Sequence, residues 1–83
     1  MAGKVRMYTL STCSHCKAAK RFMTENGIPY DATDVDLLGP AERAAILDDV
    51  KKLNPNISFP TIIIGKTVIV GFREEKIREA LNL

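Results

Sequence analysis

The sequence lacks the features that mark several large classes of protein. Its 12 Lys and Arg residues barely outnumber its 10 Asp and Glu, and a formal charge of +2 is too small to indicate a nucleic-acid or membrane surface. Its longest apolar stretch, residues 61–70, is interrupted by Gly65 and Lys66. It falls far short of the roughly 20 residues that span a bilayer. We therefore expect neither a nucleic-acid partner nor a membrane.

A secretory signal is also missing. Residues 1–10 contain no apolar core and no small-residue cleavage site, so we expect a cytoplasmic protein. The chain has 83 residues, of which 46% are hydrophobic and 27% charged. This is the size and composition of one globular domain, residues 1–83. We expect that domain to be a monomer.

Cysteine is scarce, and its two copies, Cys13 and Cys16, form one C-x-x-C motif. In the reducing cytoplasm such a pair is more often catalytic or metal-binding than a permanent disulfide. A structural zinc site needs four ligands, and besides the cysteines the motif offers His15, which lies between them. We expect a redox pair and no resident metal. A structural disulfide, and a metal or iron–sulfur cluster bound through Cys13 across a dimer, remain as alternatives.

The spacing of apolar residues predicts an alternating order of strands and helices. Period-two and β-branched runs predict strands, and apolar residues three and four apart predict helices. The expected elements are a strand over residues 5–10, a helix over 14–26 that ends at Gly27, a strand over 30–35, a helix over 40–53, two strands of a hairpin within 58–72, and a helix over 73–83. This β-α-β-α-β-β-α order predicts an α/β fold, with a four-stranded mixed sheet and three helices on both of its faces.

The first predicted helix begins at the C-x-x-C motif, which gives its cysteines different environments. Cys13 is expected at the N-terminus, where backbone N–H groups, the helix dipole and the Lys17 cation favour a thiolate. Cys16 is expected about one turn inside. We therefore predict that Cys13 is the nucleophile, Cys16 the resolving thiol, and His15 an exposed residue that tunes charge and substrate fit. The cations of this helix are expected to form a solvated face: Lys17, Lys20 and Arg21.

Three motifs follow one another along the chain: CSHC at residues 13–16, FPT at 59–61 and VGF at 70–72. In this order, over residues 5–81, they resemble the glutaredoxins of the thioredoxin superfamily. The resemblance implies a thioredoxin-like fold, thiol–disulfide oxidoreductase activity and a cis peptide bond before Pro60. It further implies protein disulfides as substrates, glutathione as a co-substrate and no tightly bound cofactor.

The resemblance also implies a set of residues that bind the substrate or glutathione: Ser11, Thr12, His15, Ser58, Phe59, Pro60, Gly71, Phe72 and Arg73. Glutathione-dependent members of the family usually have a lysine where this chain has Leu10 and a second glycine where it has Phe72. The large Phe72 side chain is expected where glutathione would approach, and Leu10 removes a cation for its carboxylate. The GFR sequence at residues 71–73 instead resembles the glutaredoxin-like redoxins that supply electrons to ribonucleotide reductase. These are themselves reduced by a thioredoxin reductase. We therefore expect the electrons to come from glutathione or from a thioredoxin reductase, and the departures at Leu10 and Phe72 favour the reductase.

Overall fold

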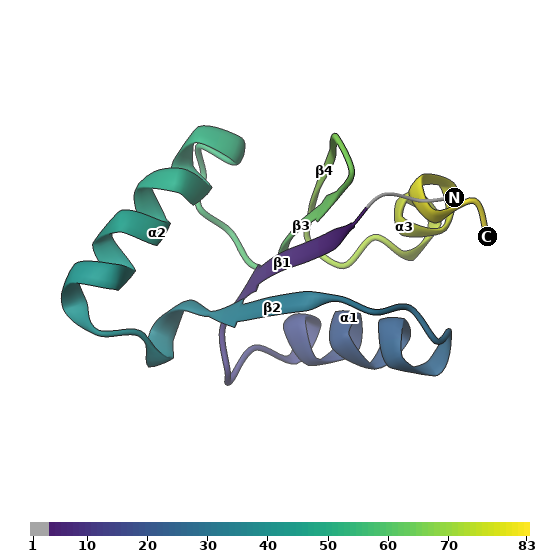
Figure 1. Ribbon diagram of the computed structural model, residues 1–83, viewed down its shortest axis with the longest axis horizontal. Coiled ribbons are helices and arrows are strands. Elements are labelled where there is room, and N and C mark those ends of the chain that lie inside the picture. The colour runs from purple at the N-terminus through teal and green to yellow at the C-terminus, as the bar shows by residue number, and fades with distance from the viewer. Residues whose placement is uncertain (1–3) are drawn as a thin grey trace.

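Strand β1 (Val5–Thr9) lies inside the sheet that organises the chain (Figure 1). The computed structural model describes residues 4–83, and within them the sheet has four strands in the order β2-β1-β3-β4. The other strands are β2 (Asp31–Asp34), β3 (Thr61–Ile64) and β4 (Thr67–Val70). β1 runs parallel to β2 and antiparallel to β3, and β4 returns antiparallel to β3. The predicted mixed sheet is therefore confirmed.

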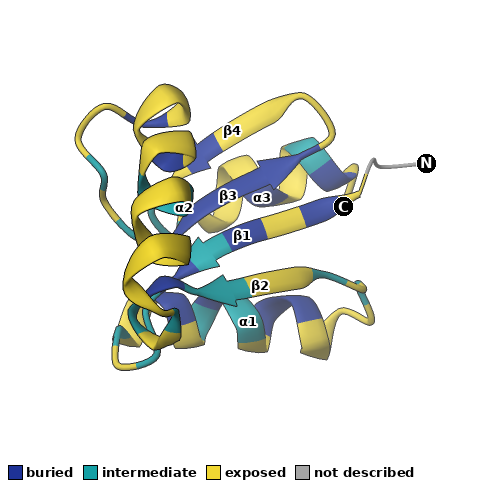
Figure 2. Ribbon diagram, turned by 60° about the vertical axis from the view of Figure 1, so that its left-hand side comes forward, coloured by how far each residue is buried: buried dark blue, intermediate teal, exposed yellow. Residues whose placement is uncertain are grey.

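Helices lie on both faces of this sheet (Figures 1 and 2). α1 (Ser14–Glu25) and α3 (Glu74–Leu81) cover one face, and α2 (Pro40–Leu53) crosses the other near the end where β1 and β2 finish. A short 3-10 helix, η1 (Val35–Leu37), connects β2 to α2. This is the predicted thioredoxin-like arrangement. In the described part of the chain, no helix is both long and apolar enough to span a bilayer.

The hydrophobic core fixes α1 and α3 on the sheet. Alternate residues of a strand point to the same face, so one set of strand side chains meets one stripe of each helix. The cluster contains Val5, Met7, Ile62, Ile64 and Ile69 from the strands, Ala19, Phe22 and Met23 from α1, and Ile77 and Leu81 from α3. Burying each large aliphatic side chain contributes about 1.5–3 kcal/mol. This packing places the first turn of α1 beside the end of β1.

The second strand ends earlier than the sequence predicted. β2 ends at Asp34, and Val35, expected as the last residue of the strand, begins η1. The reason is that Asp34 pairs with Thr9, the last residue of β1, so the residues after it have no neighbouring strand to bond. Asp34 and η1 are therefore left at the same end of the sheet as the loop that carries the cysteines.

The end of α1 follows the prediction. Asn26 caps the helix, and its N–H donates to the Phe22 carbonyl at 3.1 Å. Gly27 has a φ of +66°, the left-handed conformation that glycine adopts more easily than other residues. The helix therefore ends at Glu25, and the cysteines lie at its opposite end.

Candidate active site

The two cysteines occupy the start of α1, as predicted. Cys13 is the N-cap residue, and its carbonyl accepts the N–H of Lys17 at 3.0 Å. Its side chain is half-buried, whereas Cys16, in the first turn, is 0% exposed. The Leu10 N–H donates to Cys16 Sγ at 3.4 Å, and the Cys13 N–H donates to the Leu10 carbonyl at 3.2 Å. The structure therefore has two adjacent free thiols, one accessible and one buried.

The surroundings of Cys13 lower the pKa of its thiol below the ordinary value. Partial burial is the largest single influence, and it acts to raise the pKa because it disfavours the charged form. Hydrogen bonds from the Cys16 N–H, the Cys16 thiol and the His15 N–H favour the thiolate and together outweigh burial. A thiolate is the reactive form of cysteine, so Cys13 is equipped to be the nucleophile.

The pKa of Cys16 is raised to about 11. Burial is the largest cause, and the hydrogen bond to Cys13 and the negative charge of that residue raise the pKa further. The Leu10 N–H and the positive charge of Lys20 act in the opposite direction. In the reduced protein Cys16 therefore stays protonated, and its thiol donates a hydrogen bond to Cys13.

These opposite pKa shifts predict an order of alkylation. Because the thiolate fraction rises as the pH passes the pKa, iodoacetamide is expected to modify Cys13 at a lower pH than an ordinary cysteine, while Cys16, whose pKa in the reduced protein is about 11, reacts more slowly than Cys13 at every pH of the series. Peptide mass spectrometry of the reduced wild-type protein, alkylated briefly at a series of pH values, measures both profiles. Faster alkylation of Cys16 than of Cys13 would reverse the assignment.

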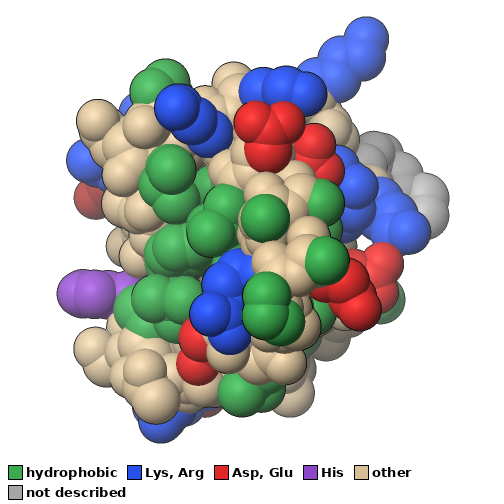
Figure 3. Space-filling view, turned by 90° about the vertical axis from the view of Figure 1, so that its left-hand side faces the viewer, with side chains coloured by type: hydrophobic (Ala, Val, Ile, Leu, Met, Phe, Trp, Pro, Cys, Tyr) green, Lys and Arg blue, Asp and Glu red, His purple; other side chains and the backbone are tan. Residues whose placement is uncertain are grey.

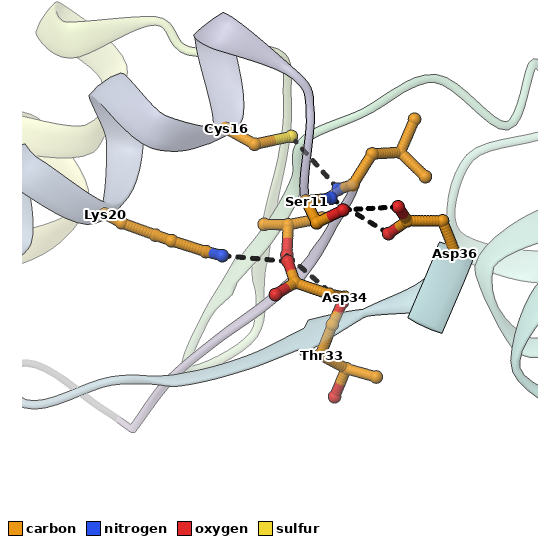
Figure 4. Close-up of polar contacts among 8 residues, drawn as sticks. Ser11, Cys16, Lys20, Thr33, Asp34 and Asp36 are labelled. Carbon is orange, nitrogen blue, oxygen red and sulfur yellow. Dashed lines mark hydrogen bonds and ion pairs between the residues drawn. The ribbon is translucent and has the colours of Figure 1, made fainter. Parts of the chain in front are cut away.

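The loop before the cysteines is held by a carboxylate of η1 (Figure 4). The Ser11 N–H donates to Asp36 Oδ1 at 2.9 Å, and the Ser11 hydroxyl donates to Asp36 Oδ2 at 2.5 Å. The hydroxyl and then the N–H of Ser11 hold the pKa of Asp36 below its usual range. Arg43 of α2 donates to the carbonyls of Asp36 and Leu38, both at 3.0 Å. The backbone that contacts Cys16 is therefore tied to η1 and α2.

Lys20 does not belong to the solvated helix face that the sequence predicted. Its Nζ donates to Asp34 Oδ1 at 2.8 Å, and the same oxygen accepts the hydroxyl of Thr9 at 2.6 Å. The Lys20 and Asp34 side chains are 25% and 26% exposed, whereas those of the surface pair Lys4 and Asp31 are 74% and 69% exposed. The parallel register sets Asp34 opposite Thr9, so the Asp34 carboxylate lies within reach of Lys20 on α1. The ion pair holds the Lys20 side chain against the protein and out of full contact with solvent.

The loop that contains Pro60 is fixed from two sides. The Phe59–Pro60 peptide bond is cis, which confirms the prediction. Asn54, 4% exposed, donates to the Ser58 carbonyl at 3.2 Å and to the Ser58 hydroxyl at 2.9 Å. The Pro60 carbonyl accepts the N–H of Gly71 at 2.8 Å. The FPT and VGF motifs are therefore joined by a backbone hydrogen bond.

Strand register brings all three motifs to one end of the sheet. Thr61, the first residue of β3, pairs with Tyr8 near the end of β1 and with Val70 at the end of β4. The loops that follow Thr9, precede Thr61 and follow Val70 therefore adjoin. The structure thus places the predicted binding residues in loops at the same end of the sheet as the cysteines: Ser11, Thr12, His15, Ser58, Phe59, Pro60, Gly71, Phe72 and Arg73.

The Phe72 side chain packs against the hydrophobic core. Its ring meets that of Phe22 edge to face, with centroids 6.0 Å apart and an interplanar angle of 61°. The Arg78 guanidinium lies 5.1 Å from the centroid of the Phe22 ring. Because aromatic pairs of this geometry are favourable, the ring turns inward. The steric obstacle to glutathione that the sequence suggested therefore does not follow from Phe72.

The rim of the site carries polar and apolar side chains. Thr12, His15 and Arg73 are exposed. Figure 3 shows hydrophobic side chains gathered on the face that carries α2, with the single histidine at the margin of that face. Leu37 of η1 is 70% exposed and follows Asp36, the residue that holds Ser11. Among residues 4–83, no three His, Cys, Asp or Glu side chains form a group that could hold a metal ion.

Sequence reasoning missed three polar residues that support the site: Asp34, Asp36 and Asn54. No role at the site is predicted from the sequence for Asn54, which follows the expected helix over residues 40–53, or for the two acids. A signal for the acids was present, because the carboxyl ends of neighbouring parallel strands meet at one edge of a sheet. Asp34 and Asp36, which end and follow β2, therefore come close to the loop that follows β1.

Comparisons with known proteins agree with this geometry. The family model for glutaredoxins matches residues 5–69. Methanoredoxin from Methanosarcina acetivorans is 44% identical, with a TM-score of 0.92 over 98% of this chain and 86% of that one. The glutaredoxin from Methanosarcina mazei Go1 is 45% identical, with a TM-score of 0.88 over 98% of this chain and 80% of that one. The gene 56 protein of Mycobacterium phage D29 is 29% identical over 79 residues, which are 94% of this chain and 82% of that protein. With the C-x-x-C motif at the start of α1 on a thioredoxin-like sheet, the chain belongs to the glutaredoxin family.

Proposed function

We propose that the protein reduces disulfides of proteins or small molecules through a dithiol mechanism. The Cys13 thiolate attacks one sulfur of the substrate disulfide, forms a mixed disulfide and releases the first substrate thiolate. Cys16 then loses its proton to solvent and attacks Cys13 Sγ. The Cys13–Cys16 bond forms, the bond from Cys13 to the substrate breaks, and the second thiolate leaves. The substrate gains two electrons, and each departing thiolate takes a proton from solvent.

The asymmetry of the two thiols is the observation that carries this proposal. Cys13 is accessible and its pKa is lowered, whereas Cys16 is 0% exposed and its pKa is raised to about 11. An external disulfide can therefore reach Cys13 but not Cys16. A buried thiol beside an accessible one is suited to an intramolecular second step, because it reacts with a sulfur that is already adjacent.

The substrate is proposed to lie across the loops that adjoin the cysteines. The exposed or half-buried members of the predicted set are proposed to line this surface: Ser11, Thr12, His15, Ser58, Phe59, Gly71 and Arg73. Phe72 is also half-buried, but its ring packs inward on Phe22. Pro60 is buried, so its contribution is to shape the loop. Exposed apolar residues such as Leu37 suit a protein substrate, because exposed apolar surface can mark a site that binds another protein.

A thioredoxin reductase is proposed to return the electrons, in the cytoplasm, where the pair is kept as a dithiol. Leu10 supports this choice over glutathione, because it stands where glutathione-dependent relatives usually have a lysine. The inward packing of Phe72 means that the choice no longer depends on that ring. Glutathione remains the alternative co-substrate, and the experiment that separates the two is given in the Discussion.

A stoichiometric reaction tests the dithiol mechanism. The reduced wild-type protein is mixed with excess 5,5′-dithiobis(2-nitrobenzoate), which yields a coloured thiolate at each exchange. We expect two equivalents of coloured thiolate per protein, in two phases, and a final protein with an internal Cys13–Cys16 disulfide. Release of one equivalent, with a stable mixed disulfide as the product, would contradict the proposal. A visible absorbance band in protein purified without oxygen would instead favour the cluster-binding alternative.

A further inference from the structure

Lys20 lies one helical turn after Cys16, on the same face of α1 (Figure 4). Residues four apart in a helix are neighbours, and helical side chains lean toward the N-terminus, so Lys20 extends back toward the turn that carries Cys16. Asp34 holds the Lys20 ammonium in this position at 2.8 Å, and Thr9 holds Asp34 at 2.6 Å. With side chains about a quarter exposed, the pair is only partly screened by solvent.

The importance of Lys20 changes during the reaction. In the reduced protein, the Cys13 thiolate raises the pKa of Cys16 through its charge and its hydrogen bond. Both influences vanish in the mixed disulfide, because Cys13 is then bonded and uncharged. Burial still opposes ionisation of Cys16, and the Leu10 N–H and the positive charge of Lys20 favour it. At that stage these two groups are the ones that oppose the cost of a buried thiolate.

We propose that Lys20 is a positioning residue for the resolving step, in which its ammonium, held by Asp34, stabilises the Cys16 thiolate as it attacks the mixed disulfide. This inference rests on the dithiol mechanism proposed above. The Leu10 N–H acts on the same sulfur but belongs to the backbone. Lys20 is therefore the partner of Cys16 that a side-chain substitution removes.

The charged groups around Cys16 come from three elements. Cys13 caps the N-terminus of α1 and Lys20 belongs to that helix. Asp34 lies at the end of β2, and Asp36 lies in η1, where its carboxylate accepts hydrogen bonds from Ser11. Asp34 is the competing candidate, as a base that accepts the Cys16 proton. The hydrogen bonds from Lys20 and then Thr9 hold the pKa of Asp34 below its usual range, which makes it a weak base. The geometry therefore favours the ammonium over the carboxylate as the group that promotes ionisation.

The two phases of the aromatic disulfide reaction separate this role from a structural one. The first phase reports attack by Cys13 and the second reports attack by Cys16. In Lys20→Met we expect the second phase at pH 7 to be about tenfold slower, with its pH midpoint moved upward, while the first phase changes less than about twofold. Lys20→Arg, which keeps the charge, is expected to restore most of the rate. Arg21→Met is the matched control, because it removes an exposed cation from the same helix.

Asp34→Asn distinguishes the two candidates. It keeps an oxygen for Lys20 and Thr9 but leaves the ammonium charge uncompensated, so the second phase is expected to be at least as fast as in the wild type. A second phase in Asp34→Asn as slow as in Lys20→Met would identify Asp34 as the proton acceptor and overturn the proposal.

A second measurement covers variants whose packing is disturbed. Cys13 is capped with iodoacetamide at mildly acidic pH, and ionisation of Cys16 is followed by thiolate absorbance in the ultraviolet. The midpoint is expected to lie higher in Lys20→Met than in the wild type and in Arg21→Met. Equal midpoints, or equal second-phase rates, overturn the role of Lys20. A wild-type protein with no second phase would instead defeat the dithiol mechanism itself.

Discussion

Replacing Cys13 by serine is expected to lower turnover with a protein disulfide by at least about 100-fold, because a serine hydroxyl is a far weaker nucleophile at neutral pH. Cys16 cannot substitute for it, since that thiol is 0% exposed and its pKa is raised to about 11. Cys16→Ser is expected to act differently. Cys13 still attacks, but the mixed disulfide has no internal thiol to resolve it and accumulates.

The measurement combines steady-state reduction of a protein disulfide with non-reducing electrophoresis and mass spectrometry of the reaction mixture. Cys13→Ser is expected to give no mixed disulfide, whereas Cys16→Ser gives one equivalent of substrate linked to Cys13. Cys16→Ala is the matched variant, because it removes the sulfur without placing a hydroxyl at a buried position beside the Leu10 N–H. Trapping by Cys13→Ser, or full turnover by both Cys16 variants, is incompatible with the assigned roles.

A thioredoxin reductase with NADPH is expected to support turnover about tenfold faster than glutathione with glutathione reductase and NADPH, at matched reductant supply. Leu10 is half-buried beside the cysteines and offers no charge to a glutathione carboxylate. Leu10→Lys is expected to lower KM for glutathione about fivefold, which corresponds to the roughly 1 kcal/mol of a favourable exposed ion pair. Reduction of a small disulfide, followed by NADPH absorbance, measures both routes.

Leu10→Met is the control for this experiment, because it changes the side chain without adding charge. Phe72→Gly is a poor test of the same question, since it removes the ring that packs on Phe22 and costs about 3 kcal/mol of stability. Wild-type turnover that is at least as fast with glutathione as with the reductase would show that the donor is glutathione. A Leu10→Lys protein with an unchanged KM would show that a cation at this position is not what glutathione binding lacks.

The sequence by itself predicted the elements and the place of the cysteine pair because these depend on short-range physics. Apolar spacing of two or of three to four residues selects strand or helix locally, and Gly27 ends α1 where the pattern stops. The position of Cys13 at a helix N-terminus needs nothing beyond its own helix, so its contrast with Cys16 could be argued before any fold was known. The family resemblance supplied what local patterns could not, the cis bond before Pro60.

The tertiary structure decided which side chains from distant segments meet. Asp34 reaches Lys20 because β1 and β2 run parallel with Thr9 opposite Asp34, a register that no local pattern specifies. Phe72 turns toward Phe22 because α1 and α3 pack on one face of the sheet, so the ring has an apolar partner there. A lysine on a helix looks solvated and a phenylalanine in a turn looks like an obstacle until their neighbours are known. The physical reason is that burial and charge pairing depend on packing between elements, whereas periodicity describes each element alone.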